Sequence, residues 1–372
     1  MKLRVTVISD VHLAHLRNES KYILANLDNN FLGHPDVKDS DIIFIAGDLF
    51  DRLLEPTNPD KSMIYMWFIR LCLFCSRNNI ILRILEGTPS HDWKQSEILP
   101  TIKDISALDL DFKYVKTLSI EYFDKFGINV LYVPDEWRPK TEETLEQVHD
   151  LMRSKGLETV DFAIMHGNFE YQLPPQIRGI PRHSSEAYLK IVSEYIFIGH
   201  IHTHSRFDRI IAQGSFDRLS HGEEEPKGFV IADVDVGKND RNAYFIENKG
   251  ARIHKTIDCT DMDLQETLEH ITKIVANLPG DSFVRIQAQD KHPLFSDMDV
   301  LLRICPTITW SKKAVIEEKT QLIRVDESVD EIYKAITLTK ENLATIMFAR
   351  PAFKNVSVDM LERSKRHLQE AL

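Results

Sequence analysis

Aspartate and histidine residues recur in this chain directly after short apolar runs. Asp10 and His12 follow the first run, and His200 and His202 repeat the same two-residue spacing after the last one. Side chains two residues apart at a strand end can both point toward one cavity. Other runs are followed by further residues of these two types, Asp48 and His166. Mixed carboxylate and imidazole donors of this kind indicate a site for divalent metal ions.

The chemistry that such a set favours is hydrolysis of a phosphoester. Two divalent ions roughly 3.5–4 Å apart can clamp the attacking and leaving oxygens of a phosphoryl group if a carboxylate bridges them, and Asp48 is the natural bridge. The donors suit manganese, iron or zinc better than calcium, and magnesium is allowed but less favoured. His91 is not required as a ligand, so it could protonate the leaving oxygen or orient the scissile phosphate. Asp51 and Asp92 are placed for hydrogen bonds to such histidines.

The elements that must position these residues are strands buried on both faces. β-branched and apolar residues fill each run, and Gly, Pro or polar clusters bound it. The runs lie at Arg4–Ser9, Ile42–Ala46, Ile80–Leu85, Phe162–Met165 and Tyr195–Ile198. In sheets built from such strands, ligands gather just beyond the strand ends. We therefore expect the Asp and His side chains to converge at one sheet edge.

The order of the elements predicts an α/β fold. From residue 1 to about 240, the strand-like runs alternate with helix-like ones at Lys21–Asn30, Ser62–Asn78, Thr141–Lys155 and Ser184–Ser193. Two more runs, Arg209–Ser215 and Gly228–Asp235, read as further strands of the same layered domain. The turn-forming residues Gly237–Asp240 then mark its end.

Two smaller segments complete the predicted organisation. Residues 241–320 predict an α+β unit with strands at Ala243–Glu247, Phe283–Gln289 and Thr307–Glu317 and helices at Asp263–Leu278 and Asp297–Ile304. This unit could cap and shape the site, and simple packing explains the pattern equally well. Residues 321–372 hold two helix-like stretches separated at Pro351. Their apolar residues could dock on the main domain or on another protein.

Composition and charge limit the class of protein. The chain has 372 residues, of which 43% are hydrophobic and 28% charged, as in an ordinary globular protein. With 57 acidic and 46 basic residues the net charge is −11, so the surface as a whole does not indicate a nucleic-acid binder. A local stripe of Lys and Arg could still hold phosphates. Because no apolar run approaches ~20 residues and the chain starts with a strand, we expect a cytoplasmic protein without membrane contact.

Cysteine use agrees with a reducing compartment. The four cysteines are too few and too scattered for a disulfide framework. Cys72 and Cys75 form a C-x-x-C, but they lie in an apolar helix-like run with no second pair to complete a zinc site. We interpret them as core residues.

Together, these motifs resemble a known superfamily. The ordered series Asp-x-His, Gly-Asp-x-x-Asp, Gly-x-x-x-His-Asp, His and Gly-His-x-His is similar to that of the calcineurin-like metallophosphoesterases. The later segment Gly214–Phe229 resembles the one after the last ligand in the SbcD-type nuclease subunits, which act in double-strand-break repair in bacteria, phages and eukaryotes. The likeness covers residues 1 to about 235.

The resemblance implies a fold, a ligand set and a partner. The fold would be a layered β-sandwich metallophosphoesterase domain flanked by helices, with a capping domain and a C-terminal helical pair that docks on a coiled-coil ABC-type ATPase of the SbcC kind. One ion would be held by Asp10, His12, Asp48 and His202, and the other by Asp48, His166 and His200. His91 would be the catalytic histidine.

One position departs from the family pattern. The family has Gly-Asn-His-Asp, in which Asn ligates the second ion, whereas this chain reads Gly87-Thr-Pro-Ser-His-Asp92 and so puts Ser90 in the Asn position. A serine hydroxyl is shorter and a weaker ligand than an amide oxygen. We therefore expect the second ion to bind loosely, to keep an extra water or to depend on the substrate phosphate, with marked activation by manganese above trace levels.

The function expected from the motifs and the resemblance is a manganese-dependent DNA nuclease subunit. It would hydrolyse phosphodiester bonds as an exonuclease or endonuclease in DNA end processing, recombination and repair. It would form a homodimer within a heterotetramer with its ATPase, in a bacterial or phage-infected cell. Two alternatives stay open, namely a phosphomonoesterase of the same superfamily and a DNA-binding scaffold subunit whose metal site has decayed at Ser90.

Loop arginines near the predicted strand ends are the candidate DNA contacts. Contacts to phosphates carry no base preference, so we expect recognition of DNA ends or structure and not of sequence. The candidates are Arg178, Arg182, Arg206 and Arg218.

Overall fold

The computed structural model describes residues 1–135, 140–174, 176, 179–238 and 240–315. The chain divides into two units, Met1–Val315 and Ile316–Leu372. The expected C-terminal helical pair within 321–372 and the candidate DNA contact Arg178 lie outside the described residues. The fold and the site below therefore belong to the first unit.

The first sheet has six strands in the order β12-β11-β1-β2-β3-β4. Four successive neighbours, β1 to β4, run parallel, while β11 pairs antiparallel with both β1 and β12. Their bounds are Lys2–Ile8 (β1), Ile42–Ala46 (β2), Ile81–Leu85 (β3), Phe112–Val115 (β4), Gly228–Asp235 (β11) and Asp240–Glu247 (β12). The predicted strands at Arg4–Ser9, Ile42–Ala46, Ile80–Leu85 and Gly228–Asp235 are confirmed.

The second sheet also has six strands, in the order β5-β6-β7-β8-β10-β9. Its central strands β6, β7, β8 and β10 are parallel. Their bounds are Ser119–Phe123 (β5), Ile128–Val133 (β6), Val160–His166 (β7), Val192–Gly199 (β8), Ser205–Phe207 (β9) and Ile210–Ala212 (β10). The strands predicted at Phe162–Met165, Tyr195–Ile198 and Arg209–Ser215 are therefore present.

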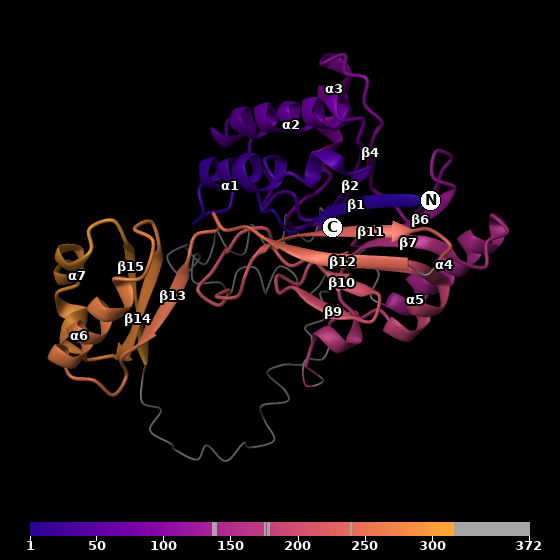
Figure 1. Ribbon diagram of the computed structural model, residues 1–372. Coiled ribbons are helices and arrows are strands. Elements are labelled where there is room, and N and C mark those ends of the chain that lie inside the picture. The colour runs from indigo at the N-terminus through magenta and orange to yellow at the C-terminus, as the bar shows by residue number, and fades with distance from the viewer. Residues whose placement is uncertain (136–139, 175, 177–178, 239, 316–372) are drawn as a thin grey trace, which may run out of the picture. The chain divides into compact units, whose positions relative to one another are not determined.

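The two sheets pack face to face, and helices cover their outer faces. On β2, Ile42 and Phe44 join the core between the sheets, whereas Ile43 and Ile45 join the core under α1, α2 and α3. This alternation follows from the two-residue period of a strand. The helices of the first sheet are α1 (Ser20–Asn26, continued by a π-helical turn at Leu27–Leu32), α2 (Asp60–Arg77) and α3 (Ile98–Ile105). Figure 1 shows them on one side of the sheets, with α4 (Thr141–Ser154) and α5 (Ser185–Ile191) on the other.

The expectation of one sheet edge was wrong, because the five ligand-bearing strands belong to two sheets. β1, β2 and β3 lie in the first sheet, and β7 and β8 in the second. A strand that is apolar on both faces has the same sequence pattern whether its second face meets a helix or another sheet. The fold is thus α/β with mixed sheets.

A smaller three-stranded parallel sheet follows, in the order β13-β14-β15. It consists of β13 (His254–Asp258), β14 (Phe283–Gln289) and β15 (Thr309–Val315), and α6 (Leu264–Val275) and α7 (Asp299–Ile304) share its apolar core. One prediction changes, because the strand expected at the start of this unit is β12, which belongs to the first sheet. The turn at Gly237 folds β12 back on β11 as a hairpin.

Two further predictions can be compared with the described helices. Cys72 and Cys75 are buried in the apolar core on α2, as expected. Within the described part of the chain, no helix has the length and apolar character needed to cross a lipid bilayer.

Short 3₁₀ turns lie at Val37–Asp39, Gln95–Glu97, Glu170–Gln172 and Pro293–Ser296.

Candidate metal centre

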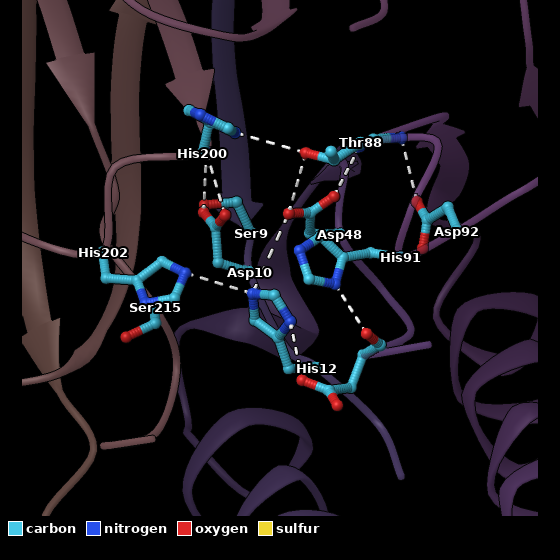
Figure 2. A network of polar contacts seen from close by, with 12 residues as sticks. Ser9, Asp10, His12, Asp48, Thr88, His91, Asp92, His200, His202 and Ser215 are labelled. Carbon is cyan, nitrogen blue, oxygen red and sulfur yellow. Dashed lines mark hydrogen bonds and ion pairs between the residues drawn. The ribbon is translucent and has the colours of Figure 1, made fainter. Parts of the chain in front are cut away.

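The carboxyl ends of parallel strands from both sheets bring the predicted Asp and His side chains together. Three groups arise among the described residues, and within each group one ligand atom per residue lies within 4.8 Å of the others. They are Asp10, His12 and His202; His12, Asp48 and His91; and Asp48, His166 and His200. Figure 2 shows the side chains of Asp10, His12, Asp48, His91, His200 and His202 gathered at this place. These buried or partly buried groups could bind a metal ion.

The backbone at the site is strained in the way that functional sites often are. Four of the clustered residues have positive φ angles, namely Asp10 (50°), His12 (52°), Asp48 (49°) and His200 (100°). Such conformations cost about 1–3 kcal/mol each for residues other than glycine and persist only where the surrounding structure enforces them. The turns after β1, β2 and β8 therefore hold their side chains in place at the expense of local backbone stability.

Two glycines are required by close packing around these turns. A Cβ atom at Gly47 would lie 2.2 Å from Nδ1 of His166, and the φ of +85° at Gly47 also disfavours any side chain. A Cβ atom at Gly87 would lie 2.1 Å from the backbone nitrogen of Asp48. The glycines of the Gly-Asp and Gly-x-x-x-His-Asp motifs thus allow the loops after β2 and β3 to approach the ligands.

The distance between two ring nitrogens of the cluster fits a bound cation. Nε2 of His12 and Nε2 of His202 are 3.1 Å apart. Nδ1 of His202 donates to Oε1 of Glu223 at 3.1 Å, whereas Nδ1 of His12 lies 3.4 Å from Oδ1 of Asp51 and has no hydrogen-bond partner among the described residues. Two bare nitrogens at this distance repel each other unless a proton or a metal ion lies between them. The donor set therefore suits an ion that takes imidazole and carboxylate together.

Backbone carbonyls orient two more histidines. Nδ1 of His166 donates to the carbonyl of Ala46 at 2.8 Å, which leaves Nε2 3.2 Å from Oδ1 of Asp48. Nδ1 of His91 donates to the carbonyl of Asp51 at 2.6 Å. Such partners set the tautomer and the direction of a histidine beside a metal site. Both rings therefore keep Nε2 for the cluster or for a ligand.

The buried charges of the site are interdependent. Burial alone would raise the pKa of Asp48, but the neighbouring His166 and His12 hold it well below its ordinary value. Burial likewise acts to lower the pKa of His166, and the charge of Asp48 outweighs this effect and raises it. A metal ion must displace the proton on Nε2 of His166, so its affinity falls as the pH falls.

Two carboxylates beside the cluster have different roles. Asp51 contacts His12 with its side chain and His91 with its carbonyl, which agrees with the expected support of histidines. Asp92 differs from the expectation, because its two oxygens accept the backbone N–H groups of Phe50 and Gly87, each at 2.9 Å. The turn that places His91 at the cluster directs the side chain of Asp92 into the protein, where its hydrogen bonds join the loops after β2 and β3.

The structure brings Thr88, which the sequence analysis did not single out, to the cluster and leaves Ser90 outside it. Ser90 is exposed to solvent. The hydroxyl oxygen of Thr88 lies 3.2 Å from Oδ2 of Asp48, 3.3 Å from Nε2 of His166 and 3.2 Å from Nδ1 of His200. The signal that could have found it is its position directly after Gly87, which is where the family's Asn stands when the motif is counted from the glycine.

The segment after the last ligand supplies another residue that the sequence did not single out. Glu223 accepts from Nδ1 of His202, while its other oxygen accepts from Ser215 Oγ at 3.2 Å and lies 3.1 Å from Nζ of Lys227. Burial acts to raise the pKa of Glu223, but His202 and Lys227 lower it to about 2. Glu223 is thus a charged carboxylate that orients His202, a candidate ligand, through the ring nitrogen that does not face the cluster.

The candidate DNA contacts are placed differently from one another. Arg206 is exposed on β9, and Arg182 is half-buried with a hydrogen bond to the carbonyl of Pro174. Arg218 is buried, and its guanidinium donates to the carbonyl of Ala251 at 2.9 Å. This position ties the chain before β13 to the main domain and leaves little of Arg218 for a phosphate.

Comparison with protein families and with curated proteins finds no match. Among solved structures, one described only as a crystal structure is 12% identical with a TM-score of 0.40. The crystal structure of TT1561 of Thermus thermophilus is 9% identical with a TM-score of 0.38. In both cases the similarity covers 66% of this chain and 100% of the other. Similarities this weak carry no conclusion about function.

Proposed function

We propose that this chain is a metal-dependent phosphodiesterase that cuts DNA, a nuclease subunit of the SbcD type among the calcineurin-like metallophosphoesterases. The observation that carries the proposal is the position of Asp48. This residue belongs to two of the ligand groups, one with His12 and one with His166 and His200. A carboxylate shared between neighbouring sets of donors is what a two-metal phosphoesterase needs.

The residues divide into two proposed ion sites. Asp10, His12, Asp48 and His202 would hold one ion, and Asp48, His166 and His200 the other. Two such ions, for which we propose manganese with magnesium as a weaker substitute, would polarise a phosphoryl group and stabilise its attacking and leaving oxygens. The protein holds these donors rigidly, since turns with positive φ and backbone hydrogen bonds fix their directions.

His91 is the proposed acid. Its Nδ1 is engaged by the carbonyl of Asp51, so Nε2 is the atom that can carry a second proton toward a leaving oxygen. His91 also lies in one group with His12 and Asp48, close to where a bound phosphate would meet the cluster. We assign the ring to the phosphate or to its leaving oxygen, the role that the family resemblance implies.

The choice of DNA as substrate is supported by the Gly214–Phe229 segment. The segment resembles that of the nuclease branch, and it provides Glu223, which holds His202. Arg206 and Arg182 are the proposed phosphate contacts, with recognition of ends or structure and not of sequence. We further propose a cytoplasmic heterotetramer in which two copies of this chain bind a coiled-coil ATPase through residues 321–372, which lie outside the described residues.

The test is cleavage of a linear duplex in manganese by the full chain and by two histidine variants. We expect His91→Ala to cut at least about 100-fold more slowly, the usual contribution of a positioned acid. His149→Ala, on an exposed face of α4, should cut like the unmodified protein. Cleavage by His91→Ala at the unmodified rate would contradict the mechanism.

Two further outcomes would replace the proposed function. Hydrolysis of p-nitrophenyl phosphate without cleavage of the duplex would support the phosphomonoesterase alternative. Protein that binds DNA but retains no manganese after dialysis, and cleaves neither substrate, would support the scaffold alternative.

A further inference from the structure

We propose that Thr88, and not Ser90, supplies the side-chain oxygen that completes the second ion's coordination. The inference rests on the two-metal site proposed above and names a ligand that the motif alone puts elsewhere. The second ion's other donors are Asp48, His166 and His200, which form one compact group. Thr88 is half-buried between them, and Figure 2 shows its side chain between Asp48 and His200.

The distances match those between ligands of one ion. The hydroxyl oxygen of Thr88 lies 3.2 Å from Asp48 Oδ2, 3.3 Å from His166 Nε2 and 3.2 Å from His200 Nδ1. An ion with bonds of about 2.1 Å has neighbouring ligand atoms about 3.0 Å apart in an octahedron and about 3.4 Å apart in a tetrahedron. All three contacts fall in this range. The hydroxyl oxygen therefore occupies a further vertex of the same coordination shell.

Hydrogen bonding and a bound cation would satisfy these contacts in different ways. A hydroxyl donates one hydrogen bond and accepts two. If it donates to Asp48, then Nε2 of His166 and Nδ1 of His200 must each carry a proton. On His166 this is the proton that an ion would displace, because Nδ1 already donates to Ala46. A cation satisfies both ring nitrogens and the hydroxyl oxygen at once.

The backbone holds the Thr88 hydroxyl in place. The amide of Thr88 donates to Oδ1 of Asp48 at 2.5 Å, and the amide of Gly87 donates to Asp92 at 2.9 Å. Threonine is β-branched, so its χ1 angle has few choices once the backbone is fixed. The oxygen is thus positioned before any ion binds.

Ser90 lies in a loop that bulges away from this position. The carbonyl of Thr88 accepts the amides of both His91 and Asp92 at 2.9 Å, which closes a tight turn. Pro89 and Ser90 form the tip of that turn, and Ser90 is exposed. The departure from Gly-Asn-His-Asp is therefore a replacement of Asn by Thr followed by two inserted residues.

The test is manganese titration of the full-length protein by calorimetry, which reports binding without activity. Thr88→Val keeps the shape and the backbone hydrogen bond but removes the oxygen, so the weaker of two binding events should lose about tenfold or more in affinity. Ser90→Ala, the matched control, should bind both ions like the unmodified protein. Normal two-ion binding by Thr88→Val, or a loss confined to Ser90→Ala, would overturn the proposal.

Two more variants guard against misfolding as the cause. Thr88→Ser retains the oxygen without the methyl group and should keep both ions, whereas Thr88→Asn should bind the second ion at least as tightly because an amide oxygen is a better ligand. Loss of the second ion in Thr88→Ser would contradict an oxygen ligand. Unmodified protein that binds two ions but leaves DNA intact contradicts only the proposed function, while protein that binds fewer than two ions contradicts both.

Discussion

Replacing Glu223 by glutamine tests how the loop before β11 supports a metal ligand. One oxygen of Glu223 accepts a hydrogen bond from Nδ1 of His202. The other oxygen accepts a hydrogen bond from Ser215 and lies 3.1 Å from Nζ of Lys227. Because the carboxylate holds the proton on Nδ1, Nε2 of His202 keeps its lone pair toward His12. A neutral amide loses the charge that favours this arrangement, and it can present its oxygen to only one of these partners.

The expected loss of metal affinity follows from this contact. Removing the partner of a liganding histidine typically lowers affinity about 10- to 100-fold, or about 1.4–2.8 kcal/mol. Stability should fall as well, because Lys227 is fully buried and loses one of its two carboxylate partners. Lys227 keeps Glu225 at 2.7 Å, so the loss should stay below the roughly 3–5 kcal/mol of a buried ion left alone.

The assay is manganese titration by calorimetry at a temperature well below the thermal transition of each variant. Glu224→Gln is the control, since this neighbour forms its ion pair with Lys255 at the protein surface. We expect Glu224→Gln to bind manganese within about twofold of the unmodified protein, as for a solvent-exposed pair. If Glu223→Gln binds manganese as tightly as Glu224→Gln, the reasoning that Glu223 holds His202 for a metal is refuted.

Two other predictions concern stability and reactivity. Burial raises the pKa of Asp217 from 3.8 to about 7, so the free energy of unfolding should fall by up to about 4 kcal/mol as the pH rises through this interval. Urea denaturation at several pH values should show that the free energy of unfolding of Asp217→Asn depends less on pH. An equal pH dependence in both proteins would contradict this. Burial also raises the pKa of Cys72 to about 12, so a thiol reagent should modify the partly exposed Cys305 before Cys72. Mass spectrometry that detects labelled Cys72 before labelled Cys305 would contradict this prediction.

Several strands that are buried on both faces could be predicted from the sequence, but Ile128–Val133 was missed although most of its residues are buried. Ile42–Ala46 and Gly228–Asp235 match the observed strands residue for residue, since both are rich in apolar residues that are stable only when buried. Phe112–Val115 and Ser119–Phe123 were missed, because these strands are partly exposed and carry polar residues on one face. His254–Asp258 was missed for the same reason.

The candidate metal ligands could likewise be predicted only in part. Asp10, His12, Asp48 and His166 could be identified because carboxylate and imidazole groups bind divalent metals and because each residue lies at or shortly after the end of an apolar strand. Their meeting across two sheets could not, because the pairing of sheets depends on contacts among residues far apart in the chain. The structure alone therefore decides which strand ends face each other.

The amino-acid sequence determined which side chains have metal-binding chemistry and which segments must be buried, because both depend on residue type and local spacing. Tertiary structure decided the supporting contacts. The hydroxyl of Thr88 meets His200 across 112 positions of the chain, and Glu223 meets His202 across 21. A threonine or a glutamate has no metal-site signature of its own in a loop, so its role arises only when folding brings it within about 3 Å of a histidine nitrogen.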